Sequence, residues 1–126
     1  MNPNPENVMQ IANSVLAERS RGGMFATTIC APLDMGNGLI QVANAGHHSI
    51  LIRNMDHSIV KKGKSGGTPL GIRQQEDYPS EKIKLDKSNL LLFYTDGALE
   101  PKNDEGEEFG MGRLKDQIIS HPESPE

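Results

Sequence analysis

Residues 90–97 read LLLFYTDG, a continuously apolar run that ends in an acidic residue and a glycine. A strand with apolar residues at consecutive positions is covered on both faces, so we expect residues 90–94 to form a strand buried on both sides. Asp96 then stands at the end of that strand, where Gly97 allows the backbone to approach a ligand closely. The run therefore predicts both a core strand and a candidate site.

A helix precedes this strand at the N-terminal end of the chain. Asn4, Pro5 and Glu6 are typical of a helix start, because they supply a capping side chain, a proline at the first helical position and an acid in the first turn. Gly22-Gly23 is typical of its end. The expected apolar stripe consists of Val8, Ile11, Ala12, Val15 and Leu16.

Several strands and a second helix follow. The turn signal at 34–38 predicts a hairpin between strands. The expected strands cover residues 24–33, 39–45, 50–53 and 58–60, with a half-exposed strand at 83–85. Met111, Leu114 and Ile118 space a short second helix. This order predicts an α+β fold with a layered, mainly antiparallel sheet and flanking helices.

Composition narrows the class of protein. The chain has 126 residues, enough for one domain, and a net charge of −4, so nucleic acid and anionic membranes are not expected partners. Its single cysteine, Cys30, lies in an apolar run and excludes a disulfide scaffold within one chain. No apolar stretch approaches the roughly 18 residues of a membrane span, and no signal peptide is evident. We expect a cytoplasmic protein whose Cys30 is a buried small hydrophobe.

Asp96 is the first candidate site residue. A carboxylate held at the end of a buried strand needs a cation or several hydrogen-bond donors to remain charged. Mg²⁺ and Mn²⁺ are hard ions that take such oxygen ligands. The alternative is an aspartate that only makes the turn after a strand.

The second candidate is the segment Ala43-Asn44-Ala45-Gly46-His47-His48. Adjacent histidines on a strand point to opposite faces, so His47 and His48 are not expected to chelate one ion, and zinc is not expected. The glycines of residues 63–67 suggest a phosphate loop, but the Walker pattern requires a glycine where Ser58 stands. A surface loop is the expectation there.

The order of these motifs resembles that of the sporulation protein E-like branch of the metal-dependent protein phosphatase 2C superfamily. The matching segments lie between Asn4 and Ile119. They are Met24-Phe25-Ala26-Thr27, Ala43 to His47, Pro69-Leu70-Gly71, Tyr94-Thr95-Asp96-Gly97, Glu100 and Phe109-Gly110.

The resemblance implies a site with two Mn²⁺ or Mg²⁺ ions at one end of paired antiparallel sheets flanked by helices. The ions hold a water that attacks the phosphorus of a phosphoserine or phosphothreonine, which makes the family protein serine/threonine phosphatases. By resemblance, Asp96 ligates one ion, Gly97 lets the strand turn beside it, and His47 hydrogen-bonds metal-held water or substrate. The substrate is expected to be a signalling phosphoprotein, often an anti-sigma-factor antagonist in this branch.

The resemblance also implies that residues 1–126 form the C-terminal half of such a domain, an incomplete α-β-β-α sandwich. The family's first motif, Asp-x-x-Gly-His-Gly, falls before the helix at Asn4, and its final metal aspartate falls in a strand after Ile119. We therefore expect a phosphatase half that is inactive alone, or a non-catalytic interaction module that retains the fold. The family's first motif upstream would favour the former, and a genuine start at Met1 the latter. Unpaired strand edges also predict a homodimer.

Overall fold

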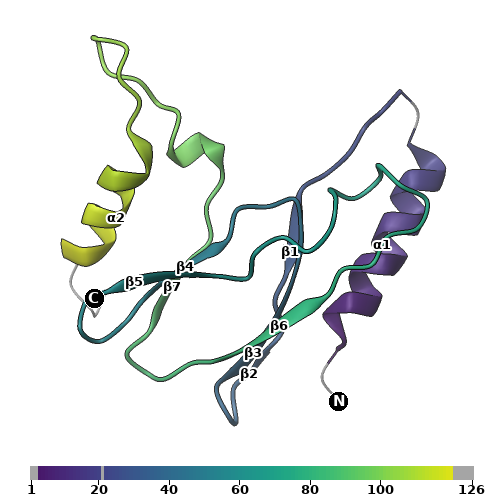
Figure 1. The fold of residues 1–126 in the computed structure, drawn as a ribbon, viewed down its shortest axis with the longest axis horizontal. Helices are drawn as coiled ribbons and strands as arrows, with labels where there is room; N and C mark the ends of the chain where they lie inside the picture. The colour runs from purple at the N-terminus through teal and green to yellow at the C-terminus, as the bar shows by residue number, and fades with distance from the viewer. Residues whose placement is uncertain (1–2, 21, 121–126) are drawn as a thin grey trace. The chain divides into compact units, whose positions relative to one another are not determined.

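The computed structural model describes residues 3–20 and 22–120, and these fall into two compact units. The first unit contains the residues up to Ser49 together with Gly63–Asp86. The second contains Ile50–Lys62 and the residues from Lys87 onward. Both units combine a helix with an antiparallel sheet (Figure 1), so the predicted α+β class is confirmed.

The first unit is organised around strand β3 (Leu39–Ala45). Along one edge, β3 pairs with β1 (Thr28–Cys30) and β2 (Leu33–Asp34), and along the other with β6 (Ser80–Lys84). All these pairings are antiparallel. The single strand expected over 24–33 is thus interrupted at Ala31-Pro32, since proline has no amide hydrogen to donate to the ladder.

The predicted hairpin between β2 and β3 is confirmed. The amide of Gly38 donates to the carbonyl oxygen of Asp34 at 2.8 Å, and the Asp34 side chain accepts from the Gly36 amide at 2.9 Å. Gly38 has a φ of 69°, and a Cβ there would lie 2.7 Å from the Leu85 carbonyl oxygen. Glycine is therefore required at this position by both backbone conformation and space.

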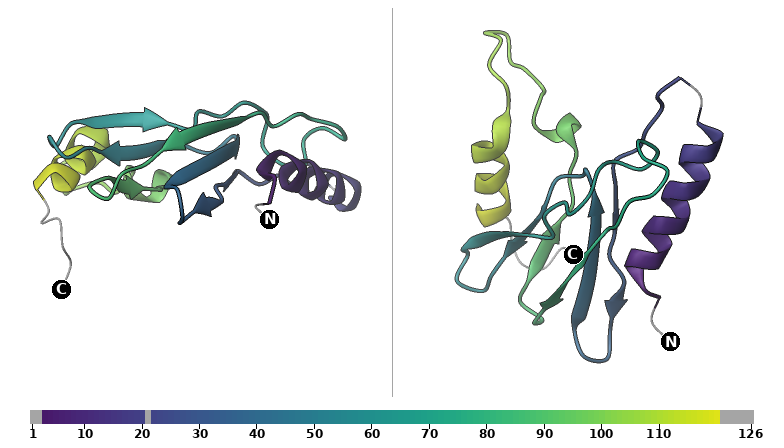
Figure 2. Two further views of the ribbon diagram at one scale, coloured as in Figure 1. Left: turned by 90° about the horizontal axis from the view of Figure 1, so that it is seen from below. Right: turned by 45° about the vertical axis from the view of Figure 1, so that its right-hand side comes forward.

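Helix α1 (Pro5–Arg19) packs beside β3 and β1 (Figure 2). Its predicted start is confirmed, because the Asn4 side chain accepts a hydrogen bond from the Glu6 amide at 3.0 Å. The core of this unit joins Met9 of the helix to Ala43, Ala45, Leu70 and Tyr78.

The predicted apolar stripe of α1 is wrong in orientation. The buried helix residues are Pro5, Met9 and Asn13. Val8, Ile11 and Val15 are exposed, whereas Ala12 and Leu16 are partly buried. The pattern failed because the buried face contains a polar residue, Asn13, which a count of apolar residues excludes.

The second unit contains a three-stranded sheet and α2 (Gly110–Ser120). Its central strand β4 (Ile50–Arg53) pairs antiparallel with β5 (Ile59–Lys62) and β7 (Leu90–Leu92). The core joins Leu51, Tyr94 and Ile118, with Met111 and Leu114 packed against it. The predicted second helix and its apolar spacing are confirmed.

The end of α2 is bound by the β4–β5 hairpin. The buried guanidinium of Arg53 donates through Nη1 to the Ile118 carbonyl oxygen at 2.7 Å. The Nδ1 of His57 lies 3.1 Å from the carbonyl oxygen of Ile119. These donors satisfy carbonyl groups that a helix C-terminus otherwise leaves unpaired.

Burial of residues 90–94 on both faces is not observed in the described chain. Leu90 is 41% and Phe93 45% exposed, whereas Tyr94 is only 7% exposed. The reason is that β7 pairs with β4 alone among the described strands, so it forms an edge of its sheet. Neither α1 nor α2, the helices of the described residues, has the length and apolar character needed to cross a membrane.

Candidate functional site

Asp96 begins the 3₁₀ turn η1 (Asp96–Ala98) directly after the buried Tyr94 and the extended Thr95. The carbonyl oxygen of Asp96 accepts hydrogen bonds from the amides of Leu99 and Glu100, both at 2.9 Å. These bonds fix the backbone that carries the carboxylate, while the residue itself is exposed. The predicted turn at the end of the strand is thus present, and its acidic side chain is at the surface.

The phenol of Tyr94 responds to both burial and the Asp96 charge. Burial raises the pKa of Tyr94, and the negative charge of Asp96 raises it further. Both effects disfavour the phenolate, so Tyr94 is a neutral core residue at physiological pH. It packs with Leu51 and Ile118 in the core of the second unit.

Gly97 does not have the backbone strain that would require glycine. Its φ is not among the positive values, and a Cβ at this position would contact only the Thr95 Oγ1, at 3.4 Å. The turn itself therefore tolerates a side chain. What glycine provides is open space beside Asp96.

A complete metal centre is not formed by the described residues alone. Asp96 offers a hard oxygen ligand of the kind that Mg²⁺ and Mn²⁺ prefer. Within residues 3–20 and 22–120, however, no group of three or more His, Cys, Asp and Glu side chains is arranged to hold an ion. The fit is therefore limited to one carboxylate, and a two-ion site requires further ligands.

In the first unit, His47 follows a tight turn at the end of β3. Gly46 has a φ of 72°, and a Cβ there would lie 2.6 Å from Pro69 Cγ. The His47 amide donates to Asn44 Oδ1 at 2.8 Å, and Asn44 Nδ2 donates back to the His47 carbonyl oxygen at 3.0 Å. The turn that presents His47 is thus closed by a buried asparagine.

The His47 ring has a defined hydrogen-bonding pattern. Its Nδ1 lies 3.0 Å from the carbonyl oxygen of His48. A carbonyl oxygen only accepts, so Nδ1 carries the hydrogen, and in the neutral ring Nε2 is left as an acceptor. His47 is half-buried, which leaves part of the ring accessible.

The two histidine side chains do not point to opposite faces as expected. Their rings meet edge to face with centroids 6.3 Å apart. The alternation rule failed because β3 ends at Ala45, so His47 and His48 lie in a turn instead of a strand. They still do not form a chelating pair through Nδ1 of His47, which is bonded to the His48 carbonyl oxygen.

Two buried asparagines, Asn44 at the His47 turn and Asn13 at residues 71–73, hold backbone segments in place, and neither role was predicted from the sequence. Asn44 also donates to the Gly63 carbonyl oxygen at 2.8 Å. Asn13 accepts from the Gly71 amide and donates to the Arg73 carbonyl oxygen, each at 2.9 Å. For Asn44 the available signal was its place in the alternation of β3 with the buried Ile40 and Val42. For Asn13 the predicted apolar stripe of α1 gave no such signal.

The chain is similar in sequence to several bacterial proteins. The chain is 29% identical over 116 residues to protein IcfG of Synechocystis sp., covering 91% of this chain and 18% of that protein. It is 26% identical over 102 residues to the phosphoserine phosphatase RsbU of Bacillus subtilis, covering 81% of this chain and 30% of RsbU. It therefore spans less than a third of these two relatives.

Two solved structures share its fold. The crystal structure of the RsbU and RsbW domains of Rv1364c from Mycobacterium tuberculosis matches with a TM-score of 0.60 and 29% identity, over 71% of this chain and 25% of that one. The manganese-presoaked phosphatase domain of the cell fate determinant SpoIIE from Bacillus subtilis matches with a TM-score of 0.61 and 18% identity, over 98% of this chain and 53% of that one.

The family assignment rests on the full length of the sequence. The family model described as Stage II sporulation protein E matches residues 1–126. The resemblance to this branch, which the order of motifs suggested, is therefore confirmed, and the match covers the whole chain. The chain belongs to the SpoIIE family, within the metal-dependent protein phosphatase superfamily.

Proposed function

We propose that this chain forms part of a metal-dependent protein serine/threonine phosphatase, in which Asp96 ligates one of two Mn²⁺ or Mg²⁺ ions. The observation that carries the proposal is the exposed Asp96 at the start of η1, on a backbone fixed by two hydrogen bonds. The substrate class is a phosphoserine- or phosphothreonine-bearing signalling protein, such as an anti-sigma-factor antagonist.

The relatives support the phosphatase activity and the use of a divalent ion in this proposal. RsbU and RsbP of Bacillus subtilis are phosphoserine phosphatases, and the SpoIIE phosphatase domain was presoaked with manganese. This chain corresponds to 53% of the SpoIIE phosphatase-domain chain. We assign residues 1–126 to the C-terminal half of such a domain and the remaining metal ligands to segments outside them, so that the chain alone has little activity.

Divalent ions at such a site would activate water and neutralise charge on the phosphoryl group. Asp96 would contribute a carboxylate whose main chain is already fixed, so little ordering accompanies ion binding. Gly97 leaves space beside it. Within the first unit, His47 has Nδ1 bonded to the His48 carbonyl oxygen, so its Nε2 would be the ring atom that accepts a hydrogen bond from a water.

Paramagnetic broadening by Mn²⁺ tests the role of Asp96 in the chain itself. At substoichiometric Mn²⁺, the amide signals of residues 95–98 should broaden in the wild type and should recover in Asp96→Asn. Asp104→Asn is the matched control, because Asp104 is an exposed acid of the same unit outside the motif. Its substitution should leave the broadening at residues 95–98 unchanged.

Two results would count against the assignment. Equal broadening of residues 95–98 in wild type and Asp96→Asn would show that the ion is held by other groups. Absence of broadening at residues 95–98 in the wild type would show that Asp96 does not hold the ion in this chain. Phosphatase activity itself is to be measured on the full-length parent chain, where Asp96→Asn should remove most of the turnover.

A further inference from the structure

The loop of residues 63–68 is bonded to the turn that presents His47. Asn44 Nδ2 donates to the Gly63 carbonyl oxygen at 2.8 Å, and the Gly66 amide lies 3.4 Å from the Asn44 carbonyl oxygen. The Gly46 amide donates to Ser65 Oγ at 2.8 Å. Ala45 and Gly67 also form a parallel bridge. The expected surface loop is thus held at both ends and at its middle.

The glycines of this loop are required by close packing. A Cβ at Gly66 would lie 2.7 Å from Pro79 Cγ, and one at Gly67 would lie 2.8 Å from Tyr78 Cδ1. Gly63 is buried, and its amide donates to Glu81 Oε2 at 3.0 Å. The glycines therefore allow the loop to lie against residues 78–81, which gives it one defined conformation.

Lys64 is the exposed cation of this fixed loop. Its neighbours Gly63 and Ser65 both take part in the bonds to Asn44 and Gly46, so the position of its backbone is set relative to His47. Lys64 forms no ion pair or side-chain hydrogen bond with the part of the chain that the structure describes. Lys61 and Lys62 precede it. Residues 61–68 contain no acid themselves, although the Glu81 and Glu76 carboxylates accept hydrogen bonds from the Gly63 amide and the Thr68 hydroxyl.

We propose that Lys64 is a phosphate-binding residue that holds the phosphoryl group of the substrate beside the His47 turn. The inference rests on the proposed function, which supplies a phosphorylated substrate. A cation without an ion-pair partner, on a backbone that needs no reordering, suits a phosphate oxygen because the flexible ammonium can adjust to it. In this loop the Lys64 side chain would bind the phosphate, whereas in a Walker loop backbone amides that precede a helix surround it.

Metal-free NMR titration separates this inference from the role of Asp96. In the presence of EDTA, O-phosphoserine and inorganic phosphate should each shift the amide signals of residues 63–68 and His47 in a saturable way, and serine should not. Lys64→Gln should weaken phosphoserine binding about fivefold, as expected for one exposed charge-assisted contact, and Lys64→Arg should retain most of it.

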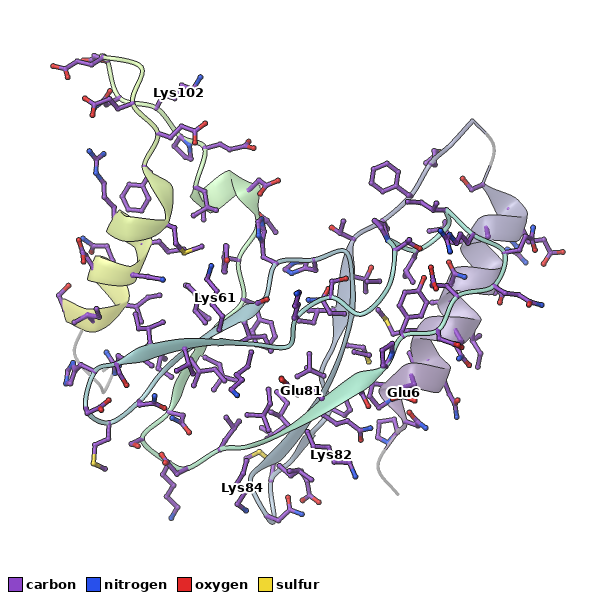
Figure 3. The ribbon with its side chains drawn as sticks, in the orientation of Figure 1. Glu6, Lys61, Glu81, Lys82, Lys84 and Lys102 are labelled. Atoms are coloured by element: carbon purple, nitrogen blue, oxygen red, sulfur yellow. The ribbon has the colours of Figure 1, made fainter. Side chains whose placement is uncertain are left out.

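Lys82→Gln is the matched control, because Lys82 is an exposed lysine of the same unit on β6 (Figure 3). It should change the affinity by less than about twofold. The inference is overturned if the signals of residues 63–68 do not shift, or if Lys82→Gln weakens binding as much as Lys64→Gln. Loss of phosphoserine binding in Asp96→Asn without metal would also overturn it. Failure of Mn²⁺ to bind Asp96 would leave the Lys64 result intact.

Discussion

Replacing Asn44 by alanine should destabilise the first unit by about 3 kcal/mol. Asn44 is only 1% exposed, and its side chain makes short hydrogen bonds of 2.8 Å with the His47 amide, 2.8 Å with the Gly63 carbonyl and 3.0 Å with the His47 carbonyl. Each contributes about 1 kcal/mol, and groups left unsatisfied in a buried position add to the loss. Asn44→Ala removes the side-chain bond between the His47 turn and Gly63, while the bond from the Gly46 amide to Ser65 Oγ remains.

Urea unfolding followed by residue-resolved NMR is the appropriate assay, since the two units need not unfold together and one midpoint would combine them. Signals of β1, β3 and β6 report on the first unit. Asn37→Ala is the control, because Asn37 is exposed and its side chain accepts one hydrogen bond, from the Leu39 amide. Its cost should be about 0.5–1 kcal/mol. A loss for Asn44→Ala no larger than that of Asn37→Ala would refute the reasoning.

Three further outcomes are expected. The isolated chain should hydrolyse para-nitrophenyl phosphate slowly with Mn²⁺, because one carboxylate does not complete a two-ion site; a rate typical of whole phosphatase domains would contradict this. Hydrogen bonds from Ser80 lower the pKa of the Glu6 carboxyl from 4.5. The difference in urea midpoint between wild type and Glu6→Gln should therefore be present above pH 4.5 and vanish as the pH falls through the lowered pKa. A difference that does not change with pH would contradict this stabilising role of Glu6. The exposed face of Val8, Ile11 and Val15 should promote self-association, visible by sedimentation equilibrium at micromolar concentration, and a stable monomer would exclude it.

Local signals in the sequence predicted the elements of the fold well. The β2–β3 hairpin, the start of α1 and the spacing of α2 depend on residues within a few positions of one another, and all were confirmed. The same holds for the turn that begins at Asp96, although β7 ends at Leu92, earlier than the expected residue 94. Periodicity and turn chemistry are sufficient for such features because the interactions that decide them are local.

The misassigned features depend on distant partners. Asn13 is buried on α1 because it binds the amide of Gly71, 58 residues away. No helical pattern reveals that partner, and three residues of the predicted apolar stripe, Val8, Ile11 and Val15, are in fact exposed. The exposure of Leu90 and Phe93 has a similar origin, since it depends on whether β7 has one neighbouring strand or two.

The contacts of the family motifs divide them into two kinds of residue. Asn44 and Gly46 are explained by the turn itself: one closes it with hydrogen bonds and the other fits where a Cβ would meet Pro69. Neither needs a substrate to account for its presence. Asp96 and His47 are different, because in each case the backbone is fixed while Asp96 is exposed and the His47 ring is only half-buried. An exposed functional group on a fixed backbone is what a binding or catalytic role demands, so these two residues and not the asparagine or glycines are the ones whose substitution should separate activity from stability.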